Sequence, residues 1–319
     1  MILCVAANPS IDKLFEVDVL KPGEIHRPRR FVQLPGGKGI HVAQVASQLG
    51  ADAVVTGILG GHAGHWVAEA LAAEGVASRF TWTARETRSS LSVADRETGR
   101  LTEFYEAGVP VTDDDWRGLE STVRSLLPGA AWVTLAGSLP PGAPPDGYAR
   151  LLTDAREAGL SVALDTRGEA LARTLREGPQ LVKINAYEAE QLLGEPVAGI
   201  EDAQRAAAEV RARAGGPGHA AVVTAGEQGM AMAGPDGNVW RGWLDARGGY
   251  PVGSGDAFLG GMLVALERGE PWPTAVALGL GAASANAEVA GAGRLDPERA
   301  RALAGAAEVR PASDTPMGE

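Results

Sequence analysis

The sequence predicts a single α/β domain in which parallel strands alternate with helices that cross over between them. Six short apolar runs suit buried strands, and most of them precede a segment with the apolar spacing of an amphipathic helix. Polar or glycine residues stand directly after several of these runs, at the end of parallel strands where ligands bind. Two further stretches alternate in polarity without a helix behind them, which predicts a second, smaller sheet.

The main sheet is expected from runs that are short, apolar and bounded by polar or glycine residues. These runs are 2–7, 53–59, 131–136, 161–165, 181–184 and 220–225. The expected helices are 39–49, 64–74, 148–158, 187–193, 200–213 and 257–268, with a further helical stretch of small residues at 279–290. A strand-then-helix order of this kind favours parallel strands with helices on both faces of the sheet.

The smaller sheet is expected from residues 14–34 and 88–108, and the second of these stretches turns back on itself at 97–99. Because the two stretches are far apart in the sequence, they would form a lid made of insertions rather than a second domain. We therefore expect residues 1–308 to fold as one domain that carries this lid. The polar, proline-containing residues 309–319 are expected to be a disordered tail.

The composition limits the classes of partner. A formal net charge of −11 argues against a nucleic acid or an anionic membrane surface, because both require a basic patch. Cys4 is the only cysteine, so no intrachain disulfide and no cysteine-based metal site can form, and its apolar surroundings predict a core residue. No stretch has the pattern of a signal peptide or a transmembrane helix. We expect a soluble, cytoplasmic protein that binds small molecules.

The segment Gly253-Ser254-Gly255-Asp256 stands directly before the helix expected at 257–268. A glycine-rich turn thus brings a carboxylate to a helix N-terminus, where free N–H groups and the helix dipole attract anions. Beside a substrate hydroxyl, Asp256 would accept the proton while the loop amides hold the charge of a phosphoryl group in transfer. The alternative is that Ser254 or Asp256 only caps the helix, which is a common start signal.

A second glycine loop, Pro35-Gly36-Gly37-Lys38-Gly39, precedes the helix expected at 39–49 and carries a cation. Adjacent glycines and a lysine at a helix start favour the close approach of an anion. The loop is not a Walker P-loop, because Gly39 follows Lys38 where that motif has Ser or Thr. No G-x-G-x-x-G follows the first strand, so a dinucleotide site lacks its fingerprint.

In order and spacing, the two glycine loops resemble the two signatures of the ribokinase-like sugar kinases, the phosphofructokinase-B family. The segment Asn8-Pro9-Ser10-Ile11-Asp12 is similar to the N-P-x-x-D opening of the branch that contains 1-phosphofructokinase and tagatose-6-phosphate kinase. Three further motifs fit the family: Ser138-Leu139-Pro140-Pro141-Gly142, Asn185-x-x-Glu188, and Thr224-Ala225-Gly226-Glu227-Gln228-Gly229. The resemblance implies a three-layer α/β/α domain with a mainly parallel central sheet and a small β-sheet lid, and an ATP- and Mg²⁺-dependent carbohydrate kinase.

The resemblance also implies a role for each matching residue. Asp256 would be the general base, and Gly253, Ser254 and Gly255 would supply the anion hole for the γ-phosphate. The sugar would be bound by Asp12, Gly36, Gly37, Lys38, His41, Arg88 and Ser138. The nucleotide would be bound by Asn185, Thr224, Gly226, Gly229 and Asn286. Glu188 and Asn185 would position Mg²⁺, mostly through water.

Each of these roles has a plainer alternative. Asp12 would suit an Asx-turn after a strand, Glu188 a solvated helix position, and Asn286 an ordinary helix surface. An arginine on a hairpin is usually solvated. Arg88, however, follows Thr87 as in the phosphosugar branch, and its planar fork suits a phosphate.

The chain departs from the family pattern at three positions. His41 stands where this branch normally has Asn, and imidazole differs from an amide in reach and can titrate. Ile184 replaces the proline of the family's K-P-N, and Ala257 replaces the frequent Ser or Thr after the catalytic Asp. None of these changes removes the base or the anion hole.

The sequence therefore predicts phosphorylation of a phosphorylated ketohexose, of the fructose 1-phosphate or tagatose 6-phosphate type, by ATP. The alternative activity is the phosphorylation of an unphosphorylated sugar or nucleoside. An alternative outside the enzymes is a non-catalytic sugar-phosphate or nucleotide sensor on the same fold. A dinucleotide oxidoreductase is the third alternative, and the sequence lacks its fingerprint. The resemblance also allows a homodimer through the lid.

Overall fold

The computed structural model describes residues 1–108, 110–246 and 248–312, and within them the strands form two sheets. The larger sheet has the strand order β15-β14-β13-β12-β11-β10-β9-β1-β4-β5, with β6 paired to β4. Its centre is parallel and consists of β1 (Ile2–Ala6), β4 (Ala53–Gly60), β9 (Trp132–Ala136), β10 (Ser161–Asp165), β11 (Leu181–Asn185) and β12 (Ala220–Thr224). The predicted fold class is confirmed.

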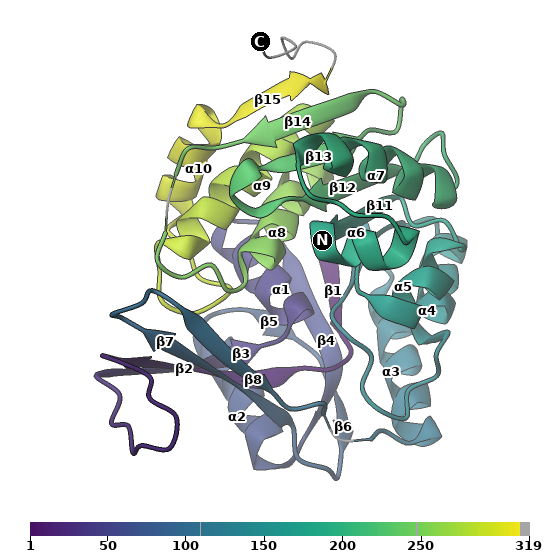
Figure 1. Ribbon diagram of the computed structural model, residues 1–319. Coiled ribbons are helices and arrows are strands. Elements are labelled where there is room, and N and C mark those ends of the chain that lie inside the picture. Colours follow the sequence, from purple (N-terminus) through teal and green to yellow (C-terminus); the bar gives the residue numbers. More distant parts are fainter. Residues whose placement is uncertain (109, 247, 313–319) are drawn as a thin grey trace.

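Helices cover both faces of this sheet (Figure 1). One face packs against α1 (Lys38–Gln48), α2 (Gly61–Ala73), α8 (Ser254–Glu267), α9 (Trp272–Ala287) and α10 (Pro297–Ala306). The other packs against α3 (Asp113–Leu126), α4 (Gly147–Glu157), α5 (Gly168–Leu175), α6 (Ala186–Leu193) and α7 (Ile200–Arg213). The alternation of side chains along a strand sends Ile2 and Cys4 into the first layer and Leu3 and Val5 into the second.

Most expected elements are present, but the helices α3, α5 and α10 and both edges of the sheet were missed. The missed helix α3 has its own start signal, since Thr112 and Asp115 form a capping box. The missed helix α5 has eight residues and no side-chain cap at its start, whereas α6, which is also eight residues long and was expected, starts with a capping box. The edges are β13 (Met230–Ala233), β14 (Val239–Trp243) and β15 (Glu308–Pro311) on one side, and β5 (Ala77–Ser78) and β6 (Thr81–Thr83) on the other.

The strand β15 corrects the expected tail. Disorder was expected from residue 309, but Val309 and Arg310 pair antiparallel with β14, and the Arg310 guanidinium lies 5.5 Å from the centre of the Trp243 ring. Backbone pairing and this cation–π contact explain why a polar segment is ordered. Residues 313–319 lie outside the described part of the chain. Within that part, no helix combines the length and the apolar character needed to cross a membrane.

The smaller sheet is the expected lid, with the strand order β3-β2-β7-β8. Its strands are β2 (Ser10–Val17), β3 (Arg30–Gly36), β7 (Arg88–Asp95) and β8 (Leu101–Tyr105). Parallel pairing of β2 with β7 sets Ser10 beside Arg88 and Asp12 beside Ser90. Because β1 leads into β2 and β3 leads into α1, the lid borders the carboxyl end of the main sheet (Figure 1).

Candidate active site

A cleft of about 910 Å³ lies between the lid and the carboxyl ends of the central strands. Its lining includes most of the predicted site: Asp12, Gly37, Lys38, His41, Arg88, Ser138, Asn185, Glu188, Thr224, Gly226, Gly253, Gly255 and Asp256. These residues come from all parts of the chain, and the parallel topology collects them at one edge of the sheet. The volume is typical of a site for small-molecule ligands.

The helix α8 presents Asp256 and free amides to this cleft. Gly253 precedes the helix with φ 77°, a conformation that favours glycine, and no side chain caps the helix. The first helical bond runs from the Ala257 N–H to the Gly253 carbonyl, at 2.8 Å. Within the described residues the Gly255 and Asp256 N–H groups donate to no other group, so they remain for an anion. The capping alternative is therefore not what the structure has.

Ser254 is engaged in holding the loop. Its N–H donates to the Pro251 carbonyl and its hydroxyl to the Ala283 carbonyl, each at 3.1 Å. These bonds use the donors that a phosphate would need. The predicted anion hole therefore loses Ser254, whereas the N–H groups of Gly253, Gly255 and Asp256 donate to no other group in the described residues.

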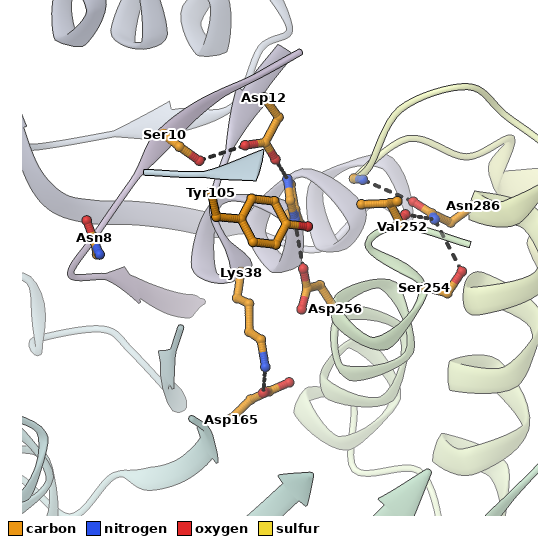
Figure 2. Close-up of polar contacts among 12 residues, drawn as sticks. Asn8, Ser10, Asp12, Lys38, Tyr105, Asp165, Val252, Ser254, Asp256 and Asn286 are labelled. Atoms are coloured by element: carbon orange, nitrogen blue, oxygen red, sulfur yellow. Dashed lines mark hydrogen bonds and ion pairs between the residues drawn. The ribbon is translucent and has the colours of Figure 1, made fainter. Parts of the chain in front are cut away.

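Two lysines that line the cleft share one buried carboxylate. The Lys38 ammonium lies 2.5 Å from Oδ1 of Asp165, and the Lys183 ammonium 2.7 Å from Oδ2 (Figure 2 shows the Lys38 pair). A Cβ at position 255 would lie 2.7 Å from the Lys183 nitrogen, which places this cation beside the loop. Burial would raise the pKa of Asp165, but the two lysines hold it below its usual value. The sequence analysis gave Lys183 and Asp165 no role, although a lysine inside an apolar strand is itself a signal.

Lys38 remains charged in this setting. Burial disfavours the ammonium, but the carboxylates of Asp165, Asp256 and Glu188 raise the pKa of Lys38 above its usual value. Its nitrogen also lies 3.4 Å from Oε1 of Glu188. A fixed positive charge therefore stands between the general-base candidate and the predicted nucleotide side of the cleft.

Asn185 and Glu188 form a capping box at the start of α6. The Glu188 N–H donates to Asn185 Oδ1 at 2.8 Å, and the Asn185 N–H donates to Glu188 Oε2 at 2.9 Å. Glu188 is 7% exposed, so it is not the solvated helix residue of the alternative interpretation. No group of three or more His, Cys, Asp or Glu side chains in the described residues is arranged to hold a metal ion. Glu188 fits only a cation that keeps mostly water and phosphate ligands.

His41 lies between the two carboxylates of the sugar side. Its Nδ1 is 2.7 Å from Oδ2 of Asp256, and its Nε2 is 3.1 Å from Oδ2 of Asp12. The Ser10 hydroxyl donates to the other oxygen of Asp12 at 2.7 Å. A Cβ at Gly36 would lie 2.1 Å from Asp12 Cγ, so Gly36 makes room for this carboxylate rather than lining the cleft. Asp12 thus belongs to a strand of the lid and not to an Asx-turn.

Arg88 lines the cleft, and its guanidinium contacts backbone carbonyls rather than a carboxylate. Its Nε and Nη2 donate to the Asn8 carbonyl at 3.2 and 3.1 Å, and its Nη1 donates to the Glu106 carbonyl at 3.0 Å. In the described residues no carboxylate lies within ion-pair distance of it. Arg167, which the sequence analysis did not single out, lines the same cleft. Two cations without a carboxylate partner suit a phosphate group.

The remaining predicted residues divide into two groups. Ser138 accepts a hydrogen bond from Asn8 Nδ2 at 3.3 Å, and Thr224 and Gly226 line the far end of the cleft. Gly229 does not line it, since a Cβ there would lie 2.2 Å from the Gly242 carbonyl in the adjoining hairpin.

The assignment of Asn286 to nucleotide binding is corrected. Its side chain is fully buried and does not line the cleft. Its amide donates to the Val252 carbonyl at 2.9 Å and accepts from the Gly293 N–H at 3.0 Å (Figure 2 shows the loop contacts). Asn286 therefore holds two loops together beside α8, because both ends of its amide are already used.

Comparison with known proteins gives matches along most of the chain. A model of the pfkB family of carbohydrate kinases matches residues 5–299. A 1-phosphofructokinase of Xanthomonas campestris pv. campestris is 33% identical over 270 residues, which is 83% of each protein.

Solved structures agree in fold. Phosphofructokinase-2 of Escherichia coli, in complex with substrates and products, has a TM-score of 0.87 at 27% identity, over 95% of this chain and 98% of that one. A possible 1-phosphofructokinase of Thermotoga maritima has a TM-score of 0.88 at 24% identity, over 98% and 99%. Arabidopsis thaliana ribokinase, complexed with ribose and ATP, has a TM-score of 0.73 at 22% identity, over 95% and 98%.

Proposed function

The chain belongs to the pfkB family of carbohydrate kinases, and we propose that it transfers the γ-phosphoryl group of ATP to a hydroxyl of a phosphorylated ketohexose. One observation carries this proposal: a buried carboxylate and free helix amides share a cleft with an arginine that has no carboxylate partner. The carboxylate and amides suit phosphoryl transfer, and the arginine suits a substrate that already bears a phosphate.

The reaction follows from these positions. A sugar hydroxyl attacks the γ-phosphorus, its proton passes to the Asp256 carboxylate, and the bond to the bridging oxygen of ADP breaks. The amides of Gly255 and Asp256 receive the charge on the transferred group, and Lys38 and Lys183 line the same cleft. Lid residues Asp12 and Arg88 hold the sugar phosphate and exclude water from the attacking position.

We propose that Mg²⁺ accompanies ATP and is positioned by Glu188 and Asn185, mainly through water. Mg²⁺ keeps several waters and takes most of its other oxygen ligands from phosphates, so the protein needs to supply few ligands. The buried Glu188 carboxylate at the nucleotide side of the cleft meets this requirement. The metal would neutralise the charge of the phosphate chain. The cytoplasm is the proposed location, because the ATP consumed by the reaction is supplied there.

The substrate is proposed to be of the fructose 1-phosphate type, with tagatose 6-phosphate as the second candidate. The relative from Xanthomonas campestris is a 1-phosphofructokinase, and Asn8, Arg88 and Arg167 form a polar, cationic end of the cleft. An unphosphorylated sugar would leave these cations without a partner, and that substrate class is accordingly not favoured.

The test measures ADP release with a panel of sugars and sugar phosphates. We expect sugar-phosphate-dependent ADP from the wild type and a loss of at least about 100-fold in kcat for Asp256→Asn, because the hydroxyl loses its proton acceptor. Asp114→Asn, at an 88% exposed side chain on α3, is the matched control and should keep full activity. Absence of sugar-dependent ADP from every panel member would contradict the kinase assignment, and activity on unphosphorylated sugars alone would contradict the role of Arg88.

We further propose a homodimer through the lid. The strand register places Phe31 and Phe104 on one face of the lid sheet, and their side chains are 54% and 58% exposed. Exposed aromatics on a sheet face are typical of protein interfaces. Escherichia coli phosphofructokinase-2 has a tetrameric inhibited form, so larger assemblies occur in the family.

A further inference from the structure

We propose that His41 is a positioning residue whose imidazolium links the carboxylates of Asp12 and Asp256 into one unit, fixing the proton acceptor relative to the sugar-binding lid. This inference rests on the proposed function, because Asp256 is the base of that reaction. An uncharged amide at this position could not offset the charge of the two carboxylates as an imidazolium does.

The link joins three elements that meet only in the tertiary structure. His41 lies on α1, Asp12 on the lid strand β2 and Asp256 on α8. The imidazole is 5% exposed, with one nitrogen 2.7 Å from Asp256 and the other 3.1 Å from Asp12. Figure 2 shows the carboxylates of Asp12 and Asp256 pointing toward each other. A side chain enclosed in this way has little freedom to leave either partner.

Both ring nitrogens face carboxylate oxygens, which favours a proton on each. Nδ1 is hydrogen-bonded to Asp256, whereas Nε2 lies at ion-pair distance from Asp12 without the alignment of a hydrogen bond, so its proton is held there by charge. A neutral imidazole donates through one nitrogen only, and the lone pair of the other would face a carboxylate oxygen. Burial disfavours the charged ring, but hydrogen bonds and charge from Asp12 and Asp256 raise the pKa of His41 to about 10. Burial would also raise the pKa of Asp12, and His41 together with Ser10 and Arg88 holds it below its usual value.

The surroundings of the link contain few other charges. Lys38 from α1, Arg88 from β7 and Tyr105 from β8 face the two carboxylates across the cleft. The remaining neighbour is the loop at Gly293, which approaches the His41 backbone without a charged side chain; behind it Arg294 pairs with Glu74 at 2.7 Å. The two carboxylates are therefore the main determinants of the ionisation of His41.

The link has two chemical consequences. It occupies Oδ2 of Asp256 and, within the described residues, leaves Oδ1 without a hydrogen-bond donor, so that Oδ1 can face the sugar hydroxyl. It also reduces the charge of the pair of carboxylates from −2 to −1, which lessens their repulsion of the γ-phosphate and of a sugar phosphate. Loss of the proton from His41 would therefore harm both orientation and charge.

The first experiment compares pH profiles of kcat/KM for the wild type, His41→Asn and His41→Gln. The wild type should lose activity as the pH rises through about 10, the point at which His41 loses its proton. Both variants lack a titrating ring and should lack this basic limb, with kcat about 10- to 100-fold lower at pH 8 and a smaller change in KM, because misplacement of the base affects the chemical step. His62→Asn, at an exposed histidine of α2, is the matched control and should retain the wild-type profile.

The second experiment reads the ionisation of His41 directly. In ¹⁵N NMR spectra of the wild type, the resonances absent from His41→Asn are those of His41, and at pH 8 both nitrogens should have imidazolium shifts. If one variant fails to fold, the other can be used to assign the His41 resonances, and ¹H–¹⁵N couplings to the backbone can assign them if both fail. The protonation state of the wild-type ring then still decides the question. A neutral ring at pH 8, or a variant that keeps the wild-type basic limb and kcat, would overturn the proposal. Failure of the kinase activity itself would appear as no sugar-dependent ADP from the wild type, while the NMR result would stand independently.

Discussion

At the scale of single residues, the site depends on buried charges that are paired with opposite charges. Asp165 is fully buried between Lys38 and Lys183, and both of its oxygens are used. The carboxylate removes the repulsion between two cations that would otherwise be unpaired in a low-dielectric setting. Both lysines line the cleft and Asp165 does not, so the positions of these two cations are set by a residue that lies behind them.

Replacing this carboxylate should therefore destabilise the protein. We expect Asp165→Asn to lower the free energy of unfolding by about 3 kcal/mol at pH 7, because one partner of a buried ion pair is removed. The pKa of Asp165 is lowered in the folded state, so its contribution is present above the unfolded-state pKa of about 4 and is lost as the pH falls through the folded-state value.

Urea unfolding from pH 7 to pH 3 checks this prediction. The difference between the wild type and Asp165→Asn should shrink as the pH falls. The exposed Asp114→Asn is the control and should change stability by less than about 0.5 kcal/mol. Equal stability of wild type and Asp165→Asn at pH 7 would show that the lysine–carboxylate cluster contributes nothing to folding.

At the scale of elements, the starts of three helices supply groups to the site. The starts of α1, α6 and α8 each bring backbone or side-chain groups to the cleft. Gly37, with φ 109°, and Gly253, with φ 77°, allow the chain to enter α1 and α8 without a side chain over the amides. The start of α6 differs, because Asn185 and Glu188 cap it reciprocally and also line the cleft.

Asn185 and Glu188 thus both cap α6 and line the cleft. The capping box of α3, which lies outside the cleft, allows these two roles to be separated. Thr112 and Asp115 form a capping box on α3 and are outside the cleft. We expect Asn185→Ala and Thr112→Ala each to lower the free energy of unfolding by about 1 kcal/mol, since each removes an N-cap side chain. Only Asn185→Ala should raise the KM for ATP, because it releases Glu188 on the nucleotide side. An equal effect of both substitutions on that KM would mean that the α6 capping box has only a structural role.

At the scale of the whole molecule, the lid is the part that would connect the proposed substrate site to the proposed dimer. The lid residues Asp12, Arg88 and Tyr105 line the cleft, while Phe31 and Phe104 expose aromatic rings on the same sheet. Residues of β2 alternate between the two faces of the sheet, so a contact on one face constrains the side chains on the other. Pairing of two lids would accordingly limit lid motion as well as bury apolar surface.

If the protein is a dimer through the lid, substitutions in the lid face should lower its mass in solution, which light scattering can measure. Phe31→Ser combined with Phe104→Ser should shift the protein from dimer toward monomer in size-exclusion chromatography with light scattering, because two exposed aromatic contacts are lost. Trp82→Ser, which removes a 45% exposed aromatic of β6 outside the lid, is the control and should leave the mass unchanged. A monomeric wild type, or a double variant with the wild-type mass, would contradict the lid interface.

Local patterns of the sequence accounted for the repeated βα units and for both glycine loops. The strand Ile2–Ala6 is a short apolar run, and the helix Ile200–Arg213 has apolar residues at helical spacing, so each can be read from its own residues. The sheet edges were missed because β13 to β15 are antiparallel strands of four or five residues, held by pairing rather than by a pattern of their own. Asn286 was misplaced because a polar residue on a helix of small residues gives no indication of which groups its amide meets.

The sequence alone therefore determined the fold class, the general-base candidate and the class of chemistry, because these depend on periodicity and on motifs of four or five neighbouring residues. Only the tertiary structure decided how the charges are paired. Asp256 follows His41 by 215 positions and Asp165 follows Lys38 by 127, and no local pattern relates residues so far apart. Their contacts arise because the parallel sheet brings the ends of distant strands and helices to one edge, where distances of about 3 Å fix which charge meets which.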